Sequence, residues 1–470
     1  MGGGLIQLIA RGVQDIYLTD DPQITFFKMI YRRHTNFSVE SRIQKFQSLP
    51  NFGETATCSI SYSGDLVGRI ILYVEIPSIP KFIESDNVKV VAWVKNLGYA
   101  LVQDVSLYIG GKLIDKQYGE FMHIWTQMTC KQKDSLSKMT GNIPKMYEFN
   151  NGKPGYALYI PLEFWFCRNT GLYLPLVAMS SSDIKITVSF RKFEECCKIG
   201  PGHSIEIEEN VCPFIRGDYI VHNGNYGYIT GFDFIKKRLY YIKLHKVNSL
   251  PHDEHNKIVS VHSPYKFVTA TGKESIEHVS LAYKPSFVNS FLYVDYVYLE
   301  NDERLKYVRI GHEYLIEQVQ FNQTLGITGS SVKMNLALKH PCKAFYWVVH
   351  SWPAPNDIFS YVNPLKVDED LMITGVLSIN GQTRFGERGP EFFNLVEPYA
   401  HHSSGPTKGI YVYSPSMYPE NHQPSSTLNM SKIDSANLIL KLNGGMRINV
   451  YTLSYNILRI SFGMTSLAFV

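Results

Sequence analysis

Apolar and polar residues alternate along many short segments of this chain, and that alternation constrains its fold more than any other feature. The pattern recurs from about residue 55 to the C-terminus. In the segment 182–190, SDIKITVSF, the Ile, Val and Phe side chains share one face of an extended strand, and the Asp, Lys and Thr side chains share the other. The chain therefore consists mainly of β-strands with one apolar face.

Turn signals and scarce helical signals favour an all-β fold. The segment 105–115, VSLYIGGKLID, alternates into Gly110-Gly111, which is typical of a tight hairpin. The segment 291–300, FLYVDYVYLE, is apolar on both faces apart from Asp295, and we expect it to be buried within a sandwich. The aromatic share of 13% also suits a pleated surface. Sandwiches or barrels are the expected architecture.

Three short segments favour helices. The apolar residues between Leu5 and Ile16 keep a helix-like spacing. Asp21 followed by Pro22 matches the preferred start of a helix. The segment NDERLKYV, from Asn301, carries two acidic residues near its N-terminus, where they favour a helical turn.

The chain also resembles itself. Leu-x-Ile-x-Gly occurs at residues 107–111 and again at 377–381, each followed by a Phe ten or eleven residues later. Met-Ser precedes an alternating strand at 179–180 and again at 430–431. A chain of 470 residues is too long for one ordinary core, so we expect two β domains of the same kind. Residues between about 200 and 265 alternate and turn like a separate small β insertion.

The charge and the cysteines exclude several classes of protein. The net charge of +4 comes from 46 basic and 42 acidic residues, which is too even for nucleic-acid binding by the whole chain. We find no apolar run of membrane-spanning length, no secretory signal and no myristoylation pattern. The seven cysteines are odd in number and form no C-x-x-C pair, so we expect reduced thiols, although Cys196-Cys197 leaves a redox-active pair open.

The search for catalytic chemistry is negative. Phosphate-binding loops, nucleophile elbows and H-E-x-x-H motifs are missing, and no H-x-H pair supports a cupin-like metal site. His252 and His255 form an H-x-x-H that we interpret as a solvated loop, because no converging third ligand is evident. His401-His402 would point to opposite faces, and Asp302-Glu303 would be helix-start electrostatics. We predict no catalytic, cofactor-binding or metal-binding residues.

The N-terminal stretch DDPQITFFKMIYRRHTNF, residues 20–37, combines aromatic and basic side chains. It is a candidate docking arm, whose contact residues would be Phe26, Phe27, Lys28, Ile30, Tyr31, Arg32 and Arg33. Two alternatives are a nucleic-acid arm, for which the basic cluster is short, and a segment that completes its own subunit's core. Three N-x-[ST] sequons, at Asn36, Asn322 and Asn429, are candidate glycan acceptors or chance matches.

Five blocks of the sequence resemble major capsid proteins of the nucleocytoplasmic large DNA viruses. They are GGGLIQLIARGVQDIYLTDDPQITFFKMIYRRHTNFS, SGDLVGRIILYVEIP, FLYVDYVYLENDERLKYVRIGHEYLIEQVQF, GPTKGIYVYSPSMYPENHQPSSTLNMSKIDSANLIL and VYTLSYNILRISFGMTSLAF. The blocks follow one another in order over nearly the whole chain, whereas residues 200–265 are the least similar to the family.

The resemblance implies an all-β fold of two consecutive eight-stranded jelly rolls. The implied domains are an N-terminal arm with short helices (1–37), a first jelly roll (38–200), an inter-domain β insertion (201–265) and a second jelly roll (266–470). It further implies homotrimeric, pseudo-hexagonal capsomers that tile an icosahedral shell. The implied partners are neighbouring capsomers, minor capsid proteins and an inner membrane, without direct nucleic-acid contact. The implied location is the virion capsid, with synthesis and assembly in the host cytoplasm.

Three other functions stay open from the sequence. The chain would alternatively be a minor or paralogous capsid protein, or a carbohydrate-binding attachment protein of the same virion. A jelly-roll enzyme is the third alternative, and the missing H-x-H pair counts against it.

Overall fold

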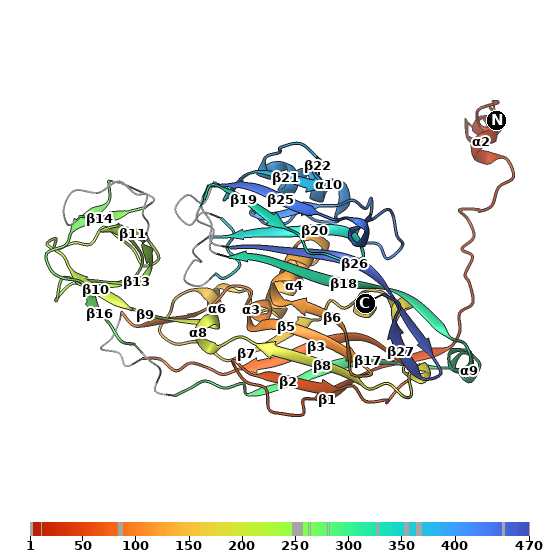
Figure 1. The fold of residues 1–470 in the computed structure, drawn as a ribbon, viewed down its shortest axis with the longest axis horizontal. Coiled ribbons are helices and arrows are strands. Elements are labelled where there is room, and N and C mark those ends of the chain that lie inside the picture. The colour runs from red at the N-terminus through yellow and green to blue at the C-terminus, as the bar shows by residue number, and fades with distance from the viewer. Residues whose placement is uncertain are drawn as a thin grey trace. The chain divides into compact units, whose positions relative to one another are not determined.

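The computed structural model describes residues 3–10, 12–82, 88–246, 257–261, 263, 265–279, 281, 283–325, 329–351, 357–362, 369–443 and 447–469. Contacts divide the chain into two units, Met1–Phe37 and Ser38–Val470. The larger unit contains two β-sandwiches and a smaller β lobe, and Figure 1 labels their elements.

The first sandwich consists of two four-stranded antiparallel sheets. One sheet has the order β1 (Phe37–Lys45), β17 (Asn289–Leu299), β3 (Leu66–Ile76) and β7 (Tyr156–Pro161). The other has the order β2 (Thr55–Ser59), β8 (Ile184–Phe190), β5 (Val102–Ile109) and β6 (Lys112–Tyr118). The predicted alternation of SDIKITVSF is confirmed, because Ile184, Ile186, Val188 and Phe190 are buried in β8.

The second sandwich repeats this strand order. One sheet has the order β18 (His312–Leu325), β26 (Arg447–Ser461), β20 (Pro341–His350) and β23 (Ile410–Tyr413), with β24 (Leu428–Asn429) and β27 (Met464–Leu467) beside it. The other has the order β19 (Ser331–Asn335), β25 (Ala436–Leu442), β21 (Met372–Ile379) and β22 (Gln382–Thr383). The two repeated Leu-x-Ile-x-Gly segments form the β5–β6 and β21–β22 hairpins, which occupy the same place in their sheets. The internal resemblance therefore reflects two copies of one fold.

The smaller lobe is a seven-stranded sheet inserted into the first sandwich. Its order is β15 (Phe267–Thr269), β14 (Lys257–Ser260), β11 (Tyr219–His222), β12 (Asn225–Asp233), β13 (Arg238–Lys246), β10 (His203–Glu206) and β16 (Ser275–Ile276). A separate ribbon of β4 (Val90–Trp93) and β9 (Cys197–Gly200) precedes the lobe.

The pairing of β17 changes the expected domain organisation. This strand follows the lobe in the chain, yet it is hydrogen-bonded to β3 in the first sandwich. The lobe, whose strands run from residue 203 to 276, thus interrupts the first sandwich instead of separating two domains at 201–265, and residues 289–299 do not belong to a second jelly roll at 266–470. Alternation reveals a strand but not its distant partner, so the sequence placed this strand in the wrong sandwich.

Helices are short and lie mostly between strands. They are α1 (Gly3–Ile9), α2 (Ile16–Thr19), α3 (Leu97–Leu101), α4 (Gly119–Thr129), α5 (Lys133–Met139), α6 (Pro144–Tyr147), α7 (Trp165–Arg168), η1 (Thr170–Leu172), η2 (Leu176–Ala178), α8 (Phe193–Cys196), α9 (Asn301–Arg309), η3 (Phe392–Val396), α10 (Glu397–His401) and η4 (Met430–Lys432). The helix expected from Asn301 is confirmed as α9. The helix start expected at Asp21 is wrong, because Asp21 has φ +45° and Pro22 begins an extended stretch.

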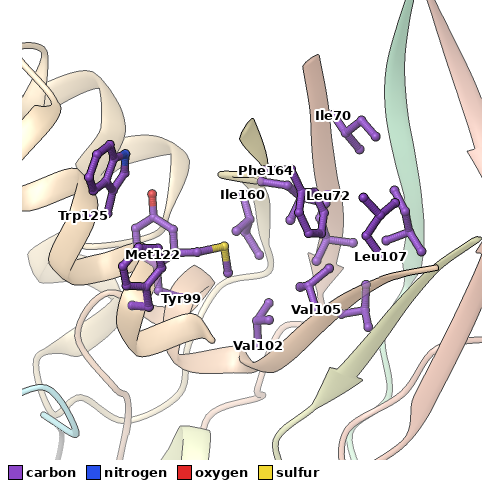
Figure 2. Packing of buried hydrophobic residues seen from close by; sticks show 14 of the residues in the cluster. Ile70, Leu72, Tyr99, Val102, Val105, Leu107, Met122, Trp125, Ile160 and Phe164 are labelled. Atoms are coloured by element: carbon purple, nitrogen blue, oxygen red, sulfur yellow. The ribbon is translucent and has the colours of Figure 1, made fainter. Parts of the chain in front are cut away.

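The core explains which strands are almost wholly apolar. Figure 2 shows Ile70 and Leu72 of β3 packed near Val105 and Leu107 of β5, between the two sheets of the first sandwich. In the second sandwich, alternate residues of β20 and β26 belong to two different clusters, one shared with the first sandwich and one facing β19, β21 and β25. The sheet that contains β20 and β26 is thus buried on both faces, and this is why β20 reads PCKAFYWVVH.

Candidate functional site

The predicted docking residues lie in an irregular segment after α2, which turns at residues 26–28. All seven are exposed, and the exposed fraction is 91% for Phe26, 99% for Phe27 and 81% for Tyr31. The helices of this arm are short, with seven residues in α1 and four in α2. Exposed rings of this kind are available for contact with a partner.

The three sequons lie in different settings. Asn36 is exposed in the extended arm. Asn322 pairs with Val450 within a sheet, and its side-chain oxygen accepts a hydrogen bond from the backbone N–H of Ala337. The Asn429 side chain accepts from the N–H of Ser431 and caps η4. Asn36 is thus the acceptor with the freest surroundings, and its use stays a prediction.

Thiol and histidine groups show no reactive arrangement in the described part of the chain. All seven cysteines are unpaired. Burial raises the pKa of Cys196 to about 12 and that of Cys197 still further, which disfavours thiolate chemistry. His401 and His402 contact the Met417 carbonyl and Glu420, and His252 and His255 lie outside the described residues.

The described residues include no group of three or more His, Cys, Asp or Glu side chains placed to hold a metal ion. Nor does any helix among them have the length and apolar character needed to cross a membrane. Asp302 and Glu303 lie in the first turn of α9, as expected of helix-start electrostatics, and Arg304 pairs with Asp65 at 2.9 Å.

A buried carboxylate joins the two sandwiches. Glu120, in the first turn of α4, lies 2.7 Å from His350 Nε2 at the end of β20. Its other oxygen accepts hydrogen bonds from Asn449 Nδ2 at 2.5 Å and Tyr451 Oη at 2.7 Å, both in β26. Tyr361 Oη donates to Glu120 at 3.1 Å. We call these five residues the carboxylate clamp.

The charge of the clamp carboxylate is compensated although the clamp is buried. All five residues are at most 6% exposed. Burial alone would raise the pKa of Glu120, but the imidazole of His350 and the two donors from β26 hold it below its usual range. The ionised Glu120 therefore holds the first sandwich to the second, because removing its carboxylate would leave buried partners unpaired.

A second charged cluster lies at the same boundary. It consists of the cations Arg168 and Lys343 with the carboxylate of Glu317 between them, and we call it the cation pair. Glu317 of β18 accepts from Arg168 at the end of α7, at 2.6 Å, and also pairs with Lys343 of β20. Lys343 is fully buried, and burial lowers its pKa while Glu317 opposes that shift. One carboxylate thus pairs with two cations, one from each sandwich: the Lys343 side chain is fully buried and the Arg168 side chain is 18% exposed.

The edges of the sandwiches also meet directly. The backbone N–H of Val319 in β18 donates to Asp115 of β6 at 3.0 Å, and the amide of Gln318 donates to the Ile114 carbonyl. Burial raises the pKa of Asp115 to about 6. These hydrogen bonds join the edges of the two sandwiches, and their role is structural.

None of these boundary residues was singled out by the sequence. The available signal was weak: Glu120 stands directly before the apolar run FMHIW, and His350 ends the apolar run of β20. A polar residue beside a buried run is informative only when its distant partners are known.

Comparison with solved structures defines the class of fold. VP54 of PBCV-1, a virus capsid structure, matches with a TM-score of 0.67 and 23% identity, over 95% of this chain and 100% of that chain. The Faustovirus major capsid protein matches with a TM-score of 0.63 and 12% identity, over 96% and 94%. The fold is therefore the double jelly roll of viral capsid proteins, and the predicted all-β fold class is confirmed.

Sequence comparison gives the family. Residues 25–214 match the family described as "Major capsid protein N-terminus", and residues 303–466 match "Large eukaryotic DNA virus major capsid protein". "Probable capsid protein 4" of Acanthamoeba polyphaga mimivirus is 49% identical, covering 100% of this chain and 99% of the relative. The "Major capsid protein" of Pyramimonas orientalis virus is 33% identical, with full coverage of both.

The chain belongs to the major capsid protein family of large eukaryotic DNA viruses. This is a family of structural, non-enzymatic proteins that form icosahedral capsids, and the chain is a component of the virion capsid. The large buried boundary between its sandwiches agrees with a building block that must keep its shape.

Proposed function

We propose that three copies of this chain form a homotrimeric, pseudo-hexagonal capsomer, and that such capsomers tile the shell. The observation that carries the proposal is the repetition of one strand order in both sandwiches. Three chains then supply six similar sandwiches, and six similar units around an axis approximate sixfold symmetry. A closed ring of this kind is the expected outcome of head-to-tail contacts that close on themselves.

Electron microscopy of the purified oligomer tests this proposal. We expect class averages with threefold symmetry and a six-lobed outline. Single particles that contain only two jelly rolls would contradict it and favour a monomeric attachment protein. Copy number in purified virions separates the principal building block from a minor or paralogous capsid protein.

The N-terminal arm is proposed to dock at the base of the capsomer, against minor capsid proteins or an inner membrane. Large apolar side chains along it are exposed, among them Leu8, Leu18, Phe27 and Met29. Its cations Lys28, Arg32 and Arg33 are exposed beside the aromatic rings and would meet acidic side chains or lipid phosphates. Helices as short as α1 and α2 are marginal alone, so partner contacts would order them.

Deleting residues 2–25 is expected to leave the sandwiches folded but to reduce shell assembly strongly. A finer variant, Phe26→Ser with Phe27→Ser, removes two exposed rings without shortening the chain. Ile235→Ser is the matched control, because Ile235 is 95% exposed on the β12–β13 hairpin of the lobe. Assembly would be followed by electron microscopy in the presence of the other capsid components. Normal shells from both the truncated chain and the Phe26→Ser, Phe27→Ser variant would rule out the docking role.

Assembly is proposed to occur in the host cytoplasm. The free state of all seven cysteines supports a reducing compartment.

A further inference from the structure

An apolar surface lies on the first sandwich, on the sheet β1-β17-β3-β7. Two rows of directly paired residues cross three strands there. We call them the aromatic face, and they are Phe291, Tyr73 and Tyr159 in one row and Tyr293, Ile71 and Pro161 in the other. Their strand neighbours Leu72, Leu158 and Leu292 are fully buried in the core, so the six side chains point away from it.

Aromatic rings on neighbouring strands of the aromatic face contact one another. The ring centroids of Tyr73 and Phe291 are 4.5 Å apart, and those of Tyr73 and Tyr159 are 5.1 Å apart. Tyr159 is 37% exposed, Phe291 is only 8% exposed, and the other four side chains are half-buried. The sequence predicted that FLYVDYVYLE is buried on both faces, whereas Tyr293 and Asp295 of this strand are only half-buried.

The outward face of the other sheet in the same sandwich is polar. Thr57 of β2 pairs with Thr187 of β8, and their hydroxyl groups are 3.0 Å apart. Thr55 pairs with Ser189 in the same way. One sheet of this sandwich thus presents hydroxyl groups and the other presents aromatic rings. The apolar surface is confined to one side of the sandwich, as expected of a contact surface.

The second sandwich shows how this kind of face is covered. Its equivalent sheet, β18-β26-β20-β23, carries a similar row in which Tyr451 and Val412 flank Tyr346. Helix α4 covers that row from the first sandwich, with the rings of Phe121 and Trp125 6.1 and 6.3 Å from Tyr346. In Figure 1, α4 lies between β20 and β26 on one side and β5 on the other.

The segment of the second sandwich that corresponds to α4 has exposed apolar side chains. Helix α4 follows β6 in the first sandwich, and the segment η3–α10 follows β22, the strand in the same place of the second. Leu395, Val396 and Tyr399 of this segment are 60%, 51% and 91% exposed. Phe393 of this segment packs into its own sandwich, but the outward side chains of the segment are uncovered within one chain, and so is part of the aromatic face.

We infer that the aromatic face is the docking surface for η3–α10 of a second copy of this chain. The contact repeats, between chains, the packing of α4 on the second sandwich within one chain. It is heterologous, because different surfaces of the two copies meet, and such a contact builds a closed ring when its rotation allows. The inference rests on the proposed capsomer and names the surfaces that would hold it together.

Two substitutions test the contact. Tyr399→Ser and Tyr293→Ser are each expected to raise the concentration at which the oligomer dissociates by about tenfold or more, because buried tyrosines dominate interface affinity. Tyr265→Ser is the matched control: Tyr265 is 92% exposed, but it lies in the lobe. The control is expected to dissociate like the unsubstituted protein. Circular dichroism would show whether each variant is folded.

Cross-linking places the two surfaces together without relying on affinity. One chain carries Tyr399→Cys, a second carries Tyr73→Cys, and the mixed oligomers are treated with a short bismaleimide. We expect a covalent dimer only in the mixture, beyond the background of the unsubstituted chain with its native cysteines.

The outcomes separate this inference from the proposed capsomer. If the unsubstituted protein is an oligomer, but Tyr399→Ser dissociates like it and no mixed dimer forms, the docking surfaces are wrong and the capsomer stands. If the unsubstituted protein is a stable monomer, both are overturned.

Discussion

Replacing Glu120 by alanine is expected to lower the free energy of unfolding by about 3–5 kcal/mol. The substitution leaves His350 without its carboxylate and removes the acceptor of Asn449 and Tyr451, all of which are buried. Because these partners belong to the second sandwich, the loss concerns the attachment of one sandwich to the other. Equilibrium urea unfolding followed by tryptophan fluorescence measures it.

The matched control is Glu313→Ala. Glu313 also pairs with a cation, Arg459 at 2.8 Å, but both side chains are more than half exposed. Solvent screening limits such a pair to about 1 kcal/mol or less. Equal losses from the two substitutions would show that burial of the carboxylate clamp does not determine its contribution.

The effect of Glu120 should also depend on pH. Its pKa in the folded chain is held below the ordinary value of 4.5, so folding favours the ionised form. The stabilisation is therefore fully present above about pH 4.5 and is lost as the pH falls through the lower folded pKa. The difference between the native chain and Glu120→Ala is expected to shrink below pH 4.5 and not to grow.

The second large effect is expected at the cation pair. Glu317→Gln removes the carboxylate that lies between Arg168 and Lys343, and leaves the fully buried Lys343 and the partly exposed Arg168 without this partner. We expect a loss of about 3–5 kcal/mol in the free energy of unfolding. Lys343→Met alone should cost less, because the ion pair between Glu317 and Arg168 remains.

The double variant decides between charge and packing. If uncompensated charge causes the loss, Lys343→Met in the Glu317→Gln background recovers part of the stability, since only the partly exposed Arg168 cation then remains. A double-mutant cycle gives the coupling energy directly. Strictly additive losses would argue that the cation pair contributes through packing alone.

Local patterns predicted the strands and the class of fold well. Alternation identified β8 and the hairpin at Gly110-Gly111, because the period of two and the turn glycines are properties of neighbouring residues. The repeated Leu-x-Ile-x-Gly segments marked two equivalent hairpins. These features need no knowledge of distant contacts.

Features that depend on distant pairing were not predicted. β17 is joined to β3 across more than two hundred residues, and no local signal says that the chain returns to the first sandwich after the lobe. The carboxylate clamp is equally non-local, since Glu120 meets residues of β20 and β26. The predicted helix start at Asp21 failed for another reason. The positive φ of Asp21 turns the chain before Pro22, and no helix begins there.

The aromatic face shows how a difference from expectation can be informative. A strand with apolar residues on both faces is normally covered on both sides. The sequence of β17 met that description, yet Tyr293 and Asp295 on its outer face are only half-buried within the chain. The expectation holds for this strand if a second copy supplies the missing cover.

The solution mass of the purified protein, measured by light scattering coupled to size exclusion, tests the central claim most directly. One chain weighs 53.7 kDa, and we predict a species of three times that mass that persists on moderate dilution. A folded, monodisperse species of 53.7 kDa under the same conditions would contradict the proposal that the chain forms trimeric capsomers by itself.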